Sequence, residues 1–268
     1  RYWRDWSSDV CSSDLGQLVW DLPRLWHEVV TGLRAAAGRH GAAVASVGVD
    51  TWGVDFAFLG ADGGLLANPV CYRDARTRGM LAAAERTVPR EEIFAATGLQ
   101  FMEINSLYQL LALRRSSASV LAAAERLLMI PDLVHWLLCG EQSNERTNAS
   151  TTQCYDPQTR DWALPLLERF QIPRRLFGPL VDPGTDLGRL RDDVAAETGL
   201  RGVRVVLPGT HDTASAVAAV PAAEPPCGQP DWCYVSLGTW ALVGAELDRP
   251  RITPECLARN FTNEAGVA

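Results

Sequence analysis

The chain has 268 residues, 47% of them hydrophobic, and its 32 acidic residues outnumber its 25 basic ones, for a formal net charge of −7. This apolar content supports a substantial core and excludes a wholly disordered chain. The acidic balance argues against nucleic acid or an anionic membrane as the main partner. No apolar run approaches the roughly 20 residues of a membrane helix, and no secretory signal is recognisable, so we expect a cytoplasmic protein.

The basic residues are all arginine, because the sequence contains no lysine. Without an amine the chain cannot use a lysine Schiff base, a Walker A loop or the strand lysine of protein kinases. The seven cysteines form no C-x-x-C pair and the four histidines are scattered, so we predict no protein-built metal site. We interpret the cysteines as small buried apolar residues.

The spacing of apolar residues predicts the first elements of the chain. Residues at i, i+3, i+4 and i+7 predict a helix over 22–39, which Asp21 is placed to cap. A short apolar strand follows and ends at Asp50. The alternation that starts at Phe56, followed by a glycine-rich turn, predicts a hairpin whose returning strand is 65–70.

Later segments alternate between helices and strands. Helical patterns cover 76–88, 106–114, 117–127, 162–170 and 192–199, and one more ends at Cys139. A strand over 203–207 runs into a polar loop and a small-residue helix over 214–220. Two strands, 233–237 and 240–244, flank a tight turn. The whole pattern predicts a mixed α/β fold.

The segment around Asp212 is the most informative for function. This carboxylate follows the strand 203–207 and opens a helix, which places it at the edge where ligands bind in α/β folds. Gly209 lets the backbone approach a ligand closely, and Thr210 and Thr213 offer hydroxyls near a helix start. The competing interpretation is that Asp212 or Thr213 only caps the helix.

Two further segments could bind ligands. The Gly238-Thr239 turn between two strands is typical of a phosphate-binding hairpin, although many ordinary hairpins have such turns. The run Asp50–Asp55 places two acids, Gly53 and an aromatic residue after a strand, a combination that suits a sugar. Its alternative is a bulge between strand and hairpin. The charged run 72–77 is typical of a solvated helix start.

Eight runs, in the order in which they stand, resemble the FGGY family of carbohydrate kinases. They are 47–56, 72–77, 105–109, 128–132, 147–153, 211–216, 236–240 and 260–264. The Asp-Thr-Trp-Gly-Val-Asp run at 50–55 and the His-Asp-Thr-Ala-Ser-Ala run at 211–216 are specific to the branch that phosphorylates L-rhamnulose. The resemblance covers residues 18–268.

The resemblance implies an α/β, ribonuclease-H-like and actin-like ATPase fold, with the first domain nearly complete and the second only begun. It implies a kinase that uses ATP and Mg²⁺ to convert L-rhamnulose to L-rhamnulose 1-phosphate in L-rhamnose catabolism. Asp212 would be the general base. Gly53, His211 and Thr213 would contact the sugar, and Thr239 would contact the ATP phosphates.

Four segments follow from this resemblance and from composition. Residues 1–15, with a repeated Ser-Ser-Asp, are interpreted as a non-native tail. Residues 16–220 would form the sugar-side domain without its first strand and phosphate hairpin. The Pro-rich stretch 221–231 would be a linker, and 232–268 the start of the nucleotide-side domain. Because parts of the ATP site are missing, we expect this chain to be inactive by itself.

Three alternatives stay open at the level of sequence. The substrate could be another ketose, such as xylulose or fuculose, because the shape of the pocket decides between ketoses. The chain could be a non-catalytic sugar-binding fragment, which the missing nucleotide elements favour. It could also be a scaffold on an actin-like fold, against which the sugar-side motifs argue.

Overall fold

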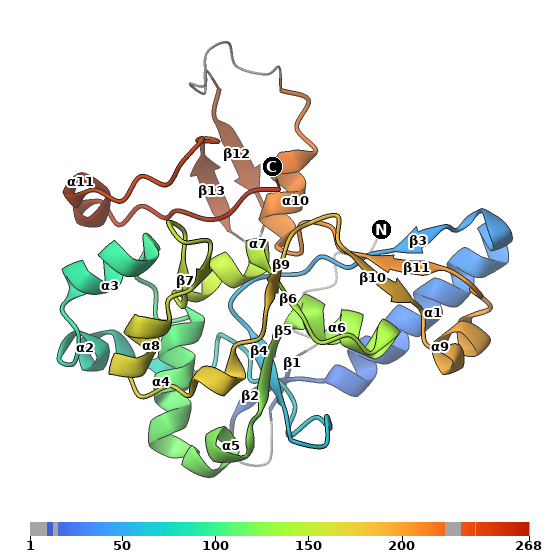
Figure 1. Cartoon of the computed structure of the whole chain (residues 1–268), viewed down its shortest axis with the longest axis horizontal. Helices are drawn as coiled ribbons and strands as arrows, with labels where there is room; N and C mark the ends of the chain where they lie inside the picture. The colour runs from blue at the N-terminus through green and yellow to red at the C-terminus, as the bar shows by residue number, and fades with distance from the viewer. Residues whose placement is uncertain (1–9, 13–15, 223–231, 239, 268) are drawn as a thin grey trace.

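The computed structural model describes residues 10–12, 16–222, 232–238 and 240–267. Its helices are α1 Leu22–His40, α2 Met80–Glu85, α3 Arg90–Thr97, α4 Ser106–Ser116, α5 Ala118–Ala123, α6 Ile130–Cys139, α7 Arg146–Ala149, α8 Leu164–Arg169, α9 Asp192–Thr198, α10 Asp212–Ala218 and α11 Pro254–Ala258. Its strands are β1 Val10–Ser12, β2 Leu18–Trp20, β3 Ser46–Val47, β4 Phe56–Leu59, β5 Arg126–Met129, β6 Asn144–Glu145, β7 Tyr155–Asp156, β8 Asp161–Trp162, β9 Leu180–Val181, β10 Asp186–Arg189, β11 Arg204–Val206, β12 Tyr234–Leu237 and β13 Ala241–Gly244. The elements confirm the predicted mixed α/β pattern (Figure 1).

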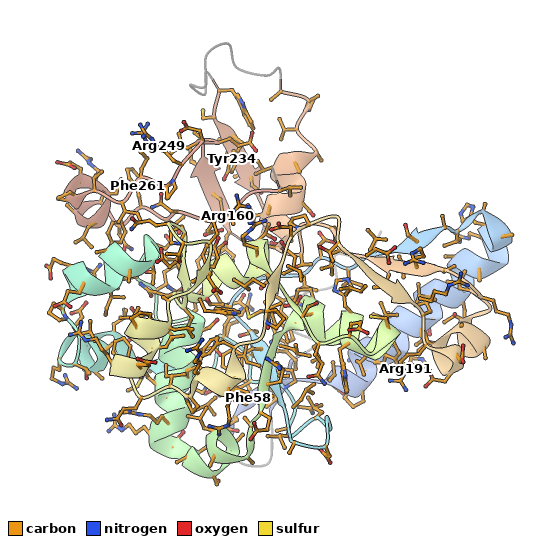
Figure 2. The ribbon with its side chains drawn as sticks, in the orientation of Figure 1. Phe58, Arg160, Arg191, Tyr234, Arg249 and Phe261 are labelled. Atoms are coloured by element: carbon orange, nitrogen blue, oxygen red, sulfur yellow. The ribbon has the colours of Figure 1, made fainter. Side chains whose placement is uncertain are left out.

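Strands β4 and β5 form the centre of the main body. They pair antiparallel, with Phe56 opposite Met129, and all four β4 side chains are buried. Because alternate side chains of a strand point to opposite faces, β4 joins two cores. Phe56 and Phe58 pack in the large core with helices α2 to α5 and α8, whereas Ala57 and Leu59 pack in a smaller cluster (Phe58 is labelled in Figure 2). Burial of both faces accounts for the continuous apolar sequence of this strand.

A second sheet holds the strands that lead to the candidate site. Its order is β10-β11-β3, and β11 runs parallel to β3 with Val205 opposite Val47. Helices α1, α6 and α9 pack a separate apolar cluster against these strands, and α1 and α9 lie side by side in Figure 1. Because β3 and β11 run in the same direction, the loops that follow them leave from the same edge of the sheet.

Several predicted helices are confirmed, together with the residues that end them. Helix α1 starts as predicted, and the Asp21 carboxylate accepts a hydrogen bond from the backbone N–H of Arg24 at 3.2 Å. Helix α6 ends at Cys139, and Gly140 follows with φ 88°, the left-handed conformation that glycine adopts at helix ends. Helices α4 and α9 and strand β11 also lie where the sequence predicts them.

The predicted hairpin forms only beside its turn, and 65–70 is not a full return strand. Leu59 and Leu65 make an antiparallel bridge and the Leu66 N–H donates to the Phe58 carbonyl at 3.0 Å, while β5 is the full partner of β4. Pro69 has no N–H to donate to a ladder, so the chain cannot continue as a full strand there. The Pro69 carbonyl instead accepts a hydrogen bond from the backbone N–H of Trp20 at 2.8 Å, which leads the chain to β2.

Three helix predictions differ in extent. The pattern over 117–127 ends as a helix at Ala123, because the next residues gain β4 as a partner and fill both cores as β5. The pattern over 76–88 divides into the end of a short 3₁₀ helix, Ala75–Thr77, and α2, which follows Gly79 at φ 75°. The pattern over 162–170 starts later, since Trp162 lies in β8. Helix α3 lies outside the predicted elements.

Parts of two predicted segments fall outside the described residues, namely 1–9 and 13–15 of the predicted tail and 223–231 of the predicted linker. Within the tail, β1 pairs antiparallel with β2. In the part of the chain that the structure describes, no helix is both long and apolar enough to span a membrane.

Candidate active site

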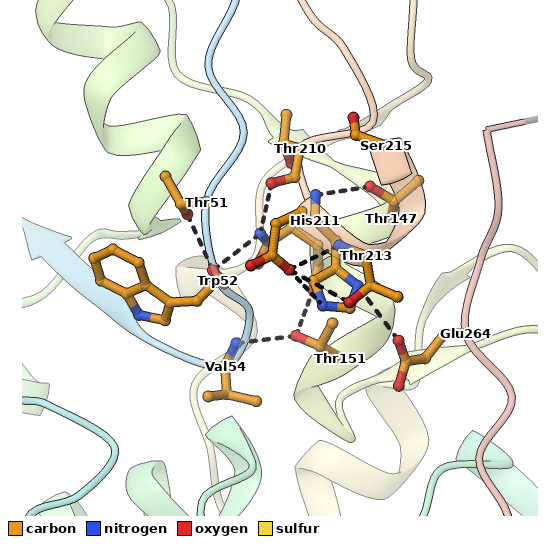
Figure 3. A network of polar contacts seen from close by, with 12 residues as sticks. Thr51, Trp52, Val54, Thr147, Thr151, Thr210, His211, Thr213, Ser215 and Glu264 are labelled. Carbon is orange, nitrogen blue, oxygen red and sulfur yellow. Dashed lines mark hydrogen bonds and ion pairs between the residues drawn. The ribbon is translucent and has the colours of Figure 1, made fainter. Parts of the chain in front are cut away.

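Two segments far apart in the sequence meet where β3 and β11 end. Thr51 and His211 form a parallel bridge there. The Thr51 N–H donates to the Thr210 carbonyl, and the Asp212 N–H donates to the Thr51 carbonyl, each at 2.9 Å. These bonds place the turn that carries Gly53 beside the start of α10 (Figure 3).

A cleft of about 370 Å³ opens at this junction, within the usual size of a small-molecule site. The turn 52–54, the start of α10 and the hairpin β12–β13 contribute to its lining. Of the residues predicted from the resemblance, Gly53, His211, Asp212 and Thr213 all line it. Much of the remaining wall is apolar and is formed by Leu99, Met102, Ile104, Ala216, Trp240 and Leu242.

The Asp212 carboxylate is 55% exposed and lies in the first turn of α10. Its Oδ1 accepts a hydrogen bond from the Thr213 N–H at 2.7 Å and lies 3.4 Å from Nε2 of His211. The N-cap position belongs to His211, so Asp212 is not the cap residue of the helix. A carboxylate that opens into a cleft in this way can accept a proton from a bound hydroxyl.

His211 lies between two carboxylates. Its Nε2 faces Asp212, and its Nδ1 is 3.3 Å from Oε2 of Glu264, which comes from the C-terminal segment (Figure 3). The His211 backbone N–H donates to Oγ1 of Thr147 at 3.1 Å. Contacts at both ring nitrogens and at the backbone therefore orient this imidazole.

A buried carboxylate supports the loop that precedes Asp212. Glu145 is 0% exposed, and its Oε2 accepts hydrogen bonds from the Thr210 N–H at 2.9 Å and from the Thr210 hydroxyl at 2.8 Å. The N–H and the hydroxyl of Thr147 also donate to this carboxylate. Since Thr147 in turn accepts from His211, the carboxylate supports the loop by two routes.

Gly53 stands where a larger residue does not fit. A Cβ at this position would lie 2.6 Å from Oγ1 of Thr151. That hydroxyl is held in place, because it accepts from the Val54 N–H at 3.0 Å and donates to the Asn148 carbonyl at 2.8 Å. The close approach of backbone to side chain therefore requires glycine.

The two acids of the run Asp50–Asp55 are not the sugar ligands that the sequence suggests. Asp50 is exposed and lies outside the residues that line the cleft. Asp55 is 0% exposed, and its oxygens accept hydrogen bonds from inside the protein, including those from the indoles of Trp20 and Trp52. Burial raises the pKa of Asp55 to about 6, against the lowering effect of these hydrogen bonds.

A short 3₁₀ helix, Ala75–Thr77, does begin in the run 72–77, but two of the charged residues of the run are not solvated as predicted. Asp74 is 8% exposed and accepts from the Leu18 N–H at 2.8 Å. The Arg76 guanidinium donates to the Gln109 side chain at 2.6 Å, and burial lowers its pKa to about 10. These residues pack behind the turn 52–54 because Gln109 also donates to Asp55.

Ser236 and Gly238 of the hairpin β12–β13 also line the cleft. Thr239, predicted to contact ATP phosphates, lies outside the described residues. Among the residues that are described, no three His, Cys, Asp or Glu side chains gather as metal ligands. The cysteines Cys71 and Cys154 are buried as expected, whereas Cys233 is exposed.

Three site residues were not singled out by sequence reasoning: Glu145, Thr151 and Glu264. The available signals were indirect, since Thr151 and Glu264 fall within runs that resemble the family and 141–154 is a polar, threonine-rich stretch. No local pattern indicates that this polar stretch is buried beside Thr210, because only the tertiary fold brings the two together.

The sequence model of the FGGY family of carbohydrate kinases, N-terminal domain, matches residues 8–219. The chain belongs to this family. The family resemblance inferred from the motifs is thereby confirmed.

Curated relatives are similar over almost all of the chain. Rhamnulokinase of Bacteroides thetaiotaomicron is 43% identical over 94% of this chain and 51% of its own length. Rhamnulokinase of Oceanobacillus iheyensis is 39% identical over 92% of this chain and 51% of its own length. The chain thus spans about half the length of the curated relatives it matches.

Solved structures of sugar kinases share the fold. The xylulose kinase of Lactobacillus acidophilus superposes with a TM-score of 0.81 at 18% identity, over 92% of this chain and 49% of that chain. A carbohydrate kinase of Novosphingobium aromaticivorans gives a TM-score of 0.76 at 26% identity, over 90% of this chain and 51% of that chain. The predicted actin-like α/β fold is confirmed.

Proposed function

We propose that this protein is an ATP-dependent sugar kinase that converts L-rhamnulose to L-rhamnulose 1-phosphate in L-rhamnose catabolism. Membership of the FGGY family and the identity to curated rhamnulokinases support the proposal. The single observation that carries it is the Asp212 carboxylate, which opens into a cleft that also contains Gly53 and His211. We place the protein in the cytoplasm, where ATP is available.

Asp212 is proposed as the general base. Phosphoryl transfer depends mainly on positioning and on neutralisation of charge. Asp212 would take the proton of the primary hydroxyl while that oxygen bonds to the γ-phosphorus of ATP and the bond to ADP breaks. A positioned base of this kind typically contributes ~10²–10⁴-fold to the rate.

Gly53, His211 and Thr213 are proposed to contact the sugar. Gly53 lines the cleft, and the Thr213 hydroxyl stands one residue after the base. The His211 imidazole is largely enclosed, with a side-chain exposure of 12%, and its ring has one carboxylate on either side. A sugar hydroxyl would take the place of one of these carboxylates as the partner of a ring nitrogen.

ATP is proposed to approach from the hairpin β12–β13, with Thr239 at its phosphates. Backbone N–H groups and hydroxyls at a turn suit a phosphate. Mg²⁺ is usually held by one or two carboxylates together with substrate phosphates. The described residues do not fit a protein-built metal site, and no step proposed here passes through the metal.

We further propose that residues 16–220 form the sugar-side domain, 221–231 a linker and 232–268 the start of the nucleotide-side domain, after a non-native tail at 1–15. Support comes from the hairpin β12–β13, which projects from the main body beside α10 (Figure 1). Tyr234 lies in this hairpin and Phe58 in the main body (Figure 2).

The activity is tested on the gene product that carries this chain together with the remaining half that its relatives have. ADP release is followed with L-rhamnulose, xylulose and fuculose in the presence of Mg-ATP. We expect turnover to be fastest with L-rhamnulose. No turnover with any ketose removes the kinase proposal, and a preference for xylulose or fuculose replaces the substrate.

Binding is tested on the chain itself by calorimetric titration. We expect weak binding of L-rhamnulose and no measurable binding of ATP, because the chain spans only about half the length of its curated relatives. Tight ATP binding would contradict the proposed division of the ATP site. Ketose binding by a gene product that has no turnover would support the alternative of a non-catalytic sugar-binding protein.

A further inference from the structure

A contact between an indole and a buried carboxylate closes the turn that carries Gly53. Asp55 Oδ2 accepts hydrogen bonds from Nε1 of Trp52 at 3.0 Å and from Nε1 of Trp20 at 2.6 Å. The two indole rings are packed together, with 4.3 Å between their centroids. Trp52 stands three residues before Asp55, so their contact encloses Gly53 and Val54. We call this contact the indole–carboxylate clasp.

The backbone inside the clasp is strained. Val54 has φ 66°, a left-handed conformation that a β-branched residue rarely adopts. Such a conformation persists only where the surroundings determine it, and it is found mostly at functional sites. Here the Asp55 N–H donates to the Gly53 carbonyl at 2.9 Å, and the Val54 carbonyl accepts from the Gln109 side chain at 3.1 Å.

The same carboxylate ties the turn to a second segment of the cleft wall. Asp55 Oδ2 also accepts from the Tyr72 N–H at 3.2 Å, and Oδ1 accepts from Nε2 of Gln109 at 3.0 Å. Trp52 and Tyr72 both line the cleft. Asp55 itself is 0% exposed, so any effect on a ligand must pass through the residues it holds.

We propose that Asp55 is a positioning residue: through the indole–carboxylate clasp and its bond to Tyr72, it holds the strained Gly53–Val54 turn in the conformation that faces the cleft. That the ligand is L-rhamnulose rests on the proposed function. The hydrogen bonds of the clasp are observed in the structure and do not depend on that proposal. The clasp predicts that ligand binding depends on the hydrogen bonds that Asp55 accepts.

Two substitutions of Asp55 distinguish the role of its hydrogen-bond acceptor from the role of its negative charge. In Asp55→Asn the amide oxygen can take the place of Oδ2, which receives both indoles and Tyr72, while the amide NH₂ meets the Gln109 NH₂. We expect Asp55→Asn to lower Tm but to keep L-rhamnulose affinity within about threefold in calorimetry. Asp55→Ala removes the acceptor, and we expect about tenfold weaker binding or more. The surface variant Asp62→Ala is the matched control.

A double-mutant cycle tests the clasp directly. Trp52→Phe keeps an aromatic ring but removes the N–H that Asp55 accepts. We expect Trp52→Phe alone to weaken L-rhamnulose binding, and the double variant with Asp55→Ala to bind no more weakly than Asp55→Ala. Losses that multiply, or an unchanged affinity of Trp52→Phe, would overturn the proposal. If Asp55→Ala does not fold, Trp52→Phe and Asp55→Asn still decide it.

Hydrogen exchange of the indole N–H groups, followed by NMR without sugar, separates this proposal from the proposed function. We expect the Trp52 N–H to be protected in the wild-type chain and to exchange about tenfold faster in Asp55→Ala. Equal exchange rates overturn the clasp whatever the sugar does. A protected indole in a chain that does not bind L-rhamnulose overturns the substrate proposal and leaves the clasp supported.

Discussion

The backbone N–H of Asp212 donates to the carbonyl oxygen of Thr51 at 2.9 Å. This bond joins the first residue of α10 to the segment that carries Gly53, so the proposed base and the proposed sugar contact stand on one hydrogen-bonded junction. The hydrogen bonds of this junction fix the placement of the two segments relative to each other, which the correct distances of a reaction require.

The first prediction concerns the carboxylate in the cleft. In the gene product that carries the chain, Asp212→Asn is expected to lower kcat by ~10²-fold or more, because an amide cannot accept the proton. Sugar affinity in calorimetry should stay within about threefold, since the amide keeps the shape of the side chain. Asp62→Asn, in the turn after β4, is the control. An unchanged kcat would show that another group removes the proton.

The second prediction concerns the tight approach at Gly53. Gly53→Ala places a methyl group against the held Thr151 side chain and is expected to lower the free energy of unfolding by about 1–3 kcal/mol. L-rhamnulose binding should weaken as well. The matched control is Gly38→Ala in α1, where a Cβ meets nothing within 4 Å. That substitution is expected to stabilise the chain by about 0.5–1 kcal/mol. Equal effects in urea unfolding would refute the steric argument.

The third prediction concerns the buried support of the loop. Glu145→Gln replaces an oxygen acceptor by an NH₂ group that faces the N–H donors of Thr147 or Thr210. The free energy of unfolding is expected to fall by about 1–3 kcal/mol, because a buried donor is left without its acceptor. Glu141→Gln, at an exposed position nearby, should have little effect. A neutral Glu145→Gln in urea unfolding would mean that the carboxylate is not needed to hold the loop.

The fourth prediction concerns the pH dependence of stability. Burial raises the pKa of Asp55 from 3.8 to about 6, and the Arg76 guanidinium interacts electrostatically with both Asp55 and Asp74. Between these pH values the native state binds more protons than the unfolded state, so stability is lost as pH rises. The unfolding free energy of the wild type minus that of Asp55→Asn should fall by about 3 kcal/mol across this window.

Unfolding by urea at several pH values measures this difference. The unfolding free energy of the wild type minus that of Asp132→Asn should also fall as pH rises, because burial raises the pKa of Asp132 well above its usual range. A difference that grows as pH rises would mean that Asp55 ionises more easily in the native state than in the unfolded state.

Local features of the sequence were sufficient for many elements. Asp21 and Gly140 mark helix ends because capping depends on neighbouring residues alone. The segment after Ala123 and the return strand 65–70 could not be predicted in this way. Their structure depends on how far each segment pairs with β4, and β5, which is distant in the sequence, is the full partner of that strand.

The motifs around Gly53 and Asp212 could be recognised from the sequence because a ligand site needs particular residue types at short spacing. Their union in one cleft was decided by the parallel pairing of β3 with β11. The tertiary structure alone assigned Asp55 to the protein interior and Glu145 to the support of the Thr210 loop. The physical reason is that burial and long-range hydrogen bonds are properties of the packed chain, and a linear pattern cannot tell an acid that meets a ligand from one that meets the core.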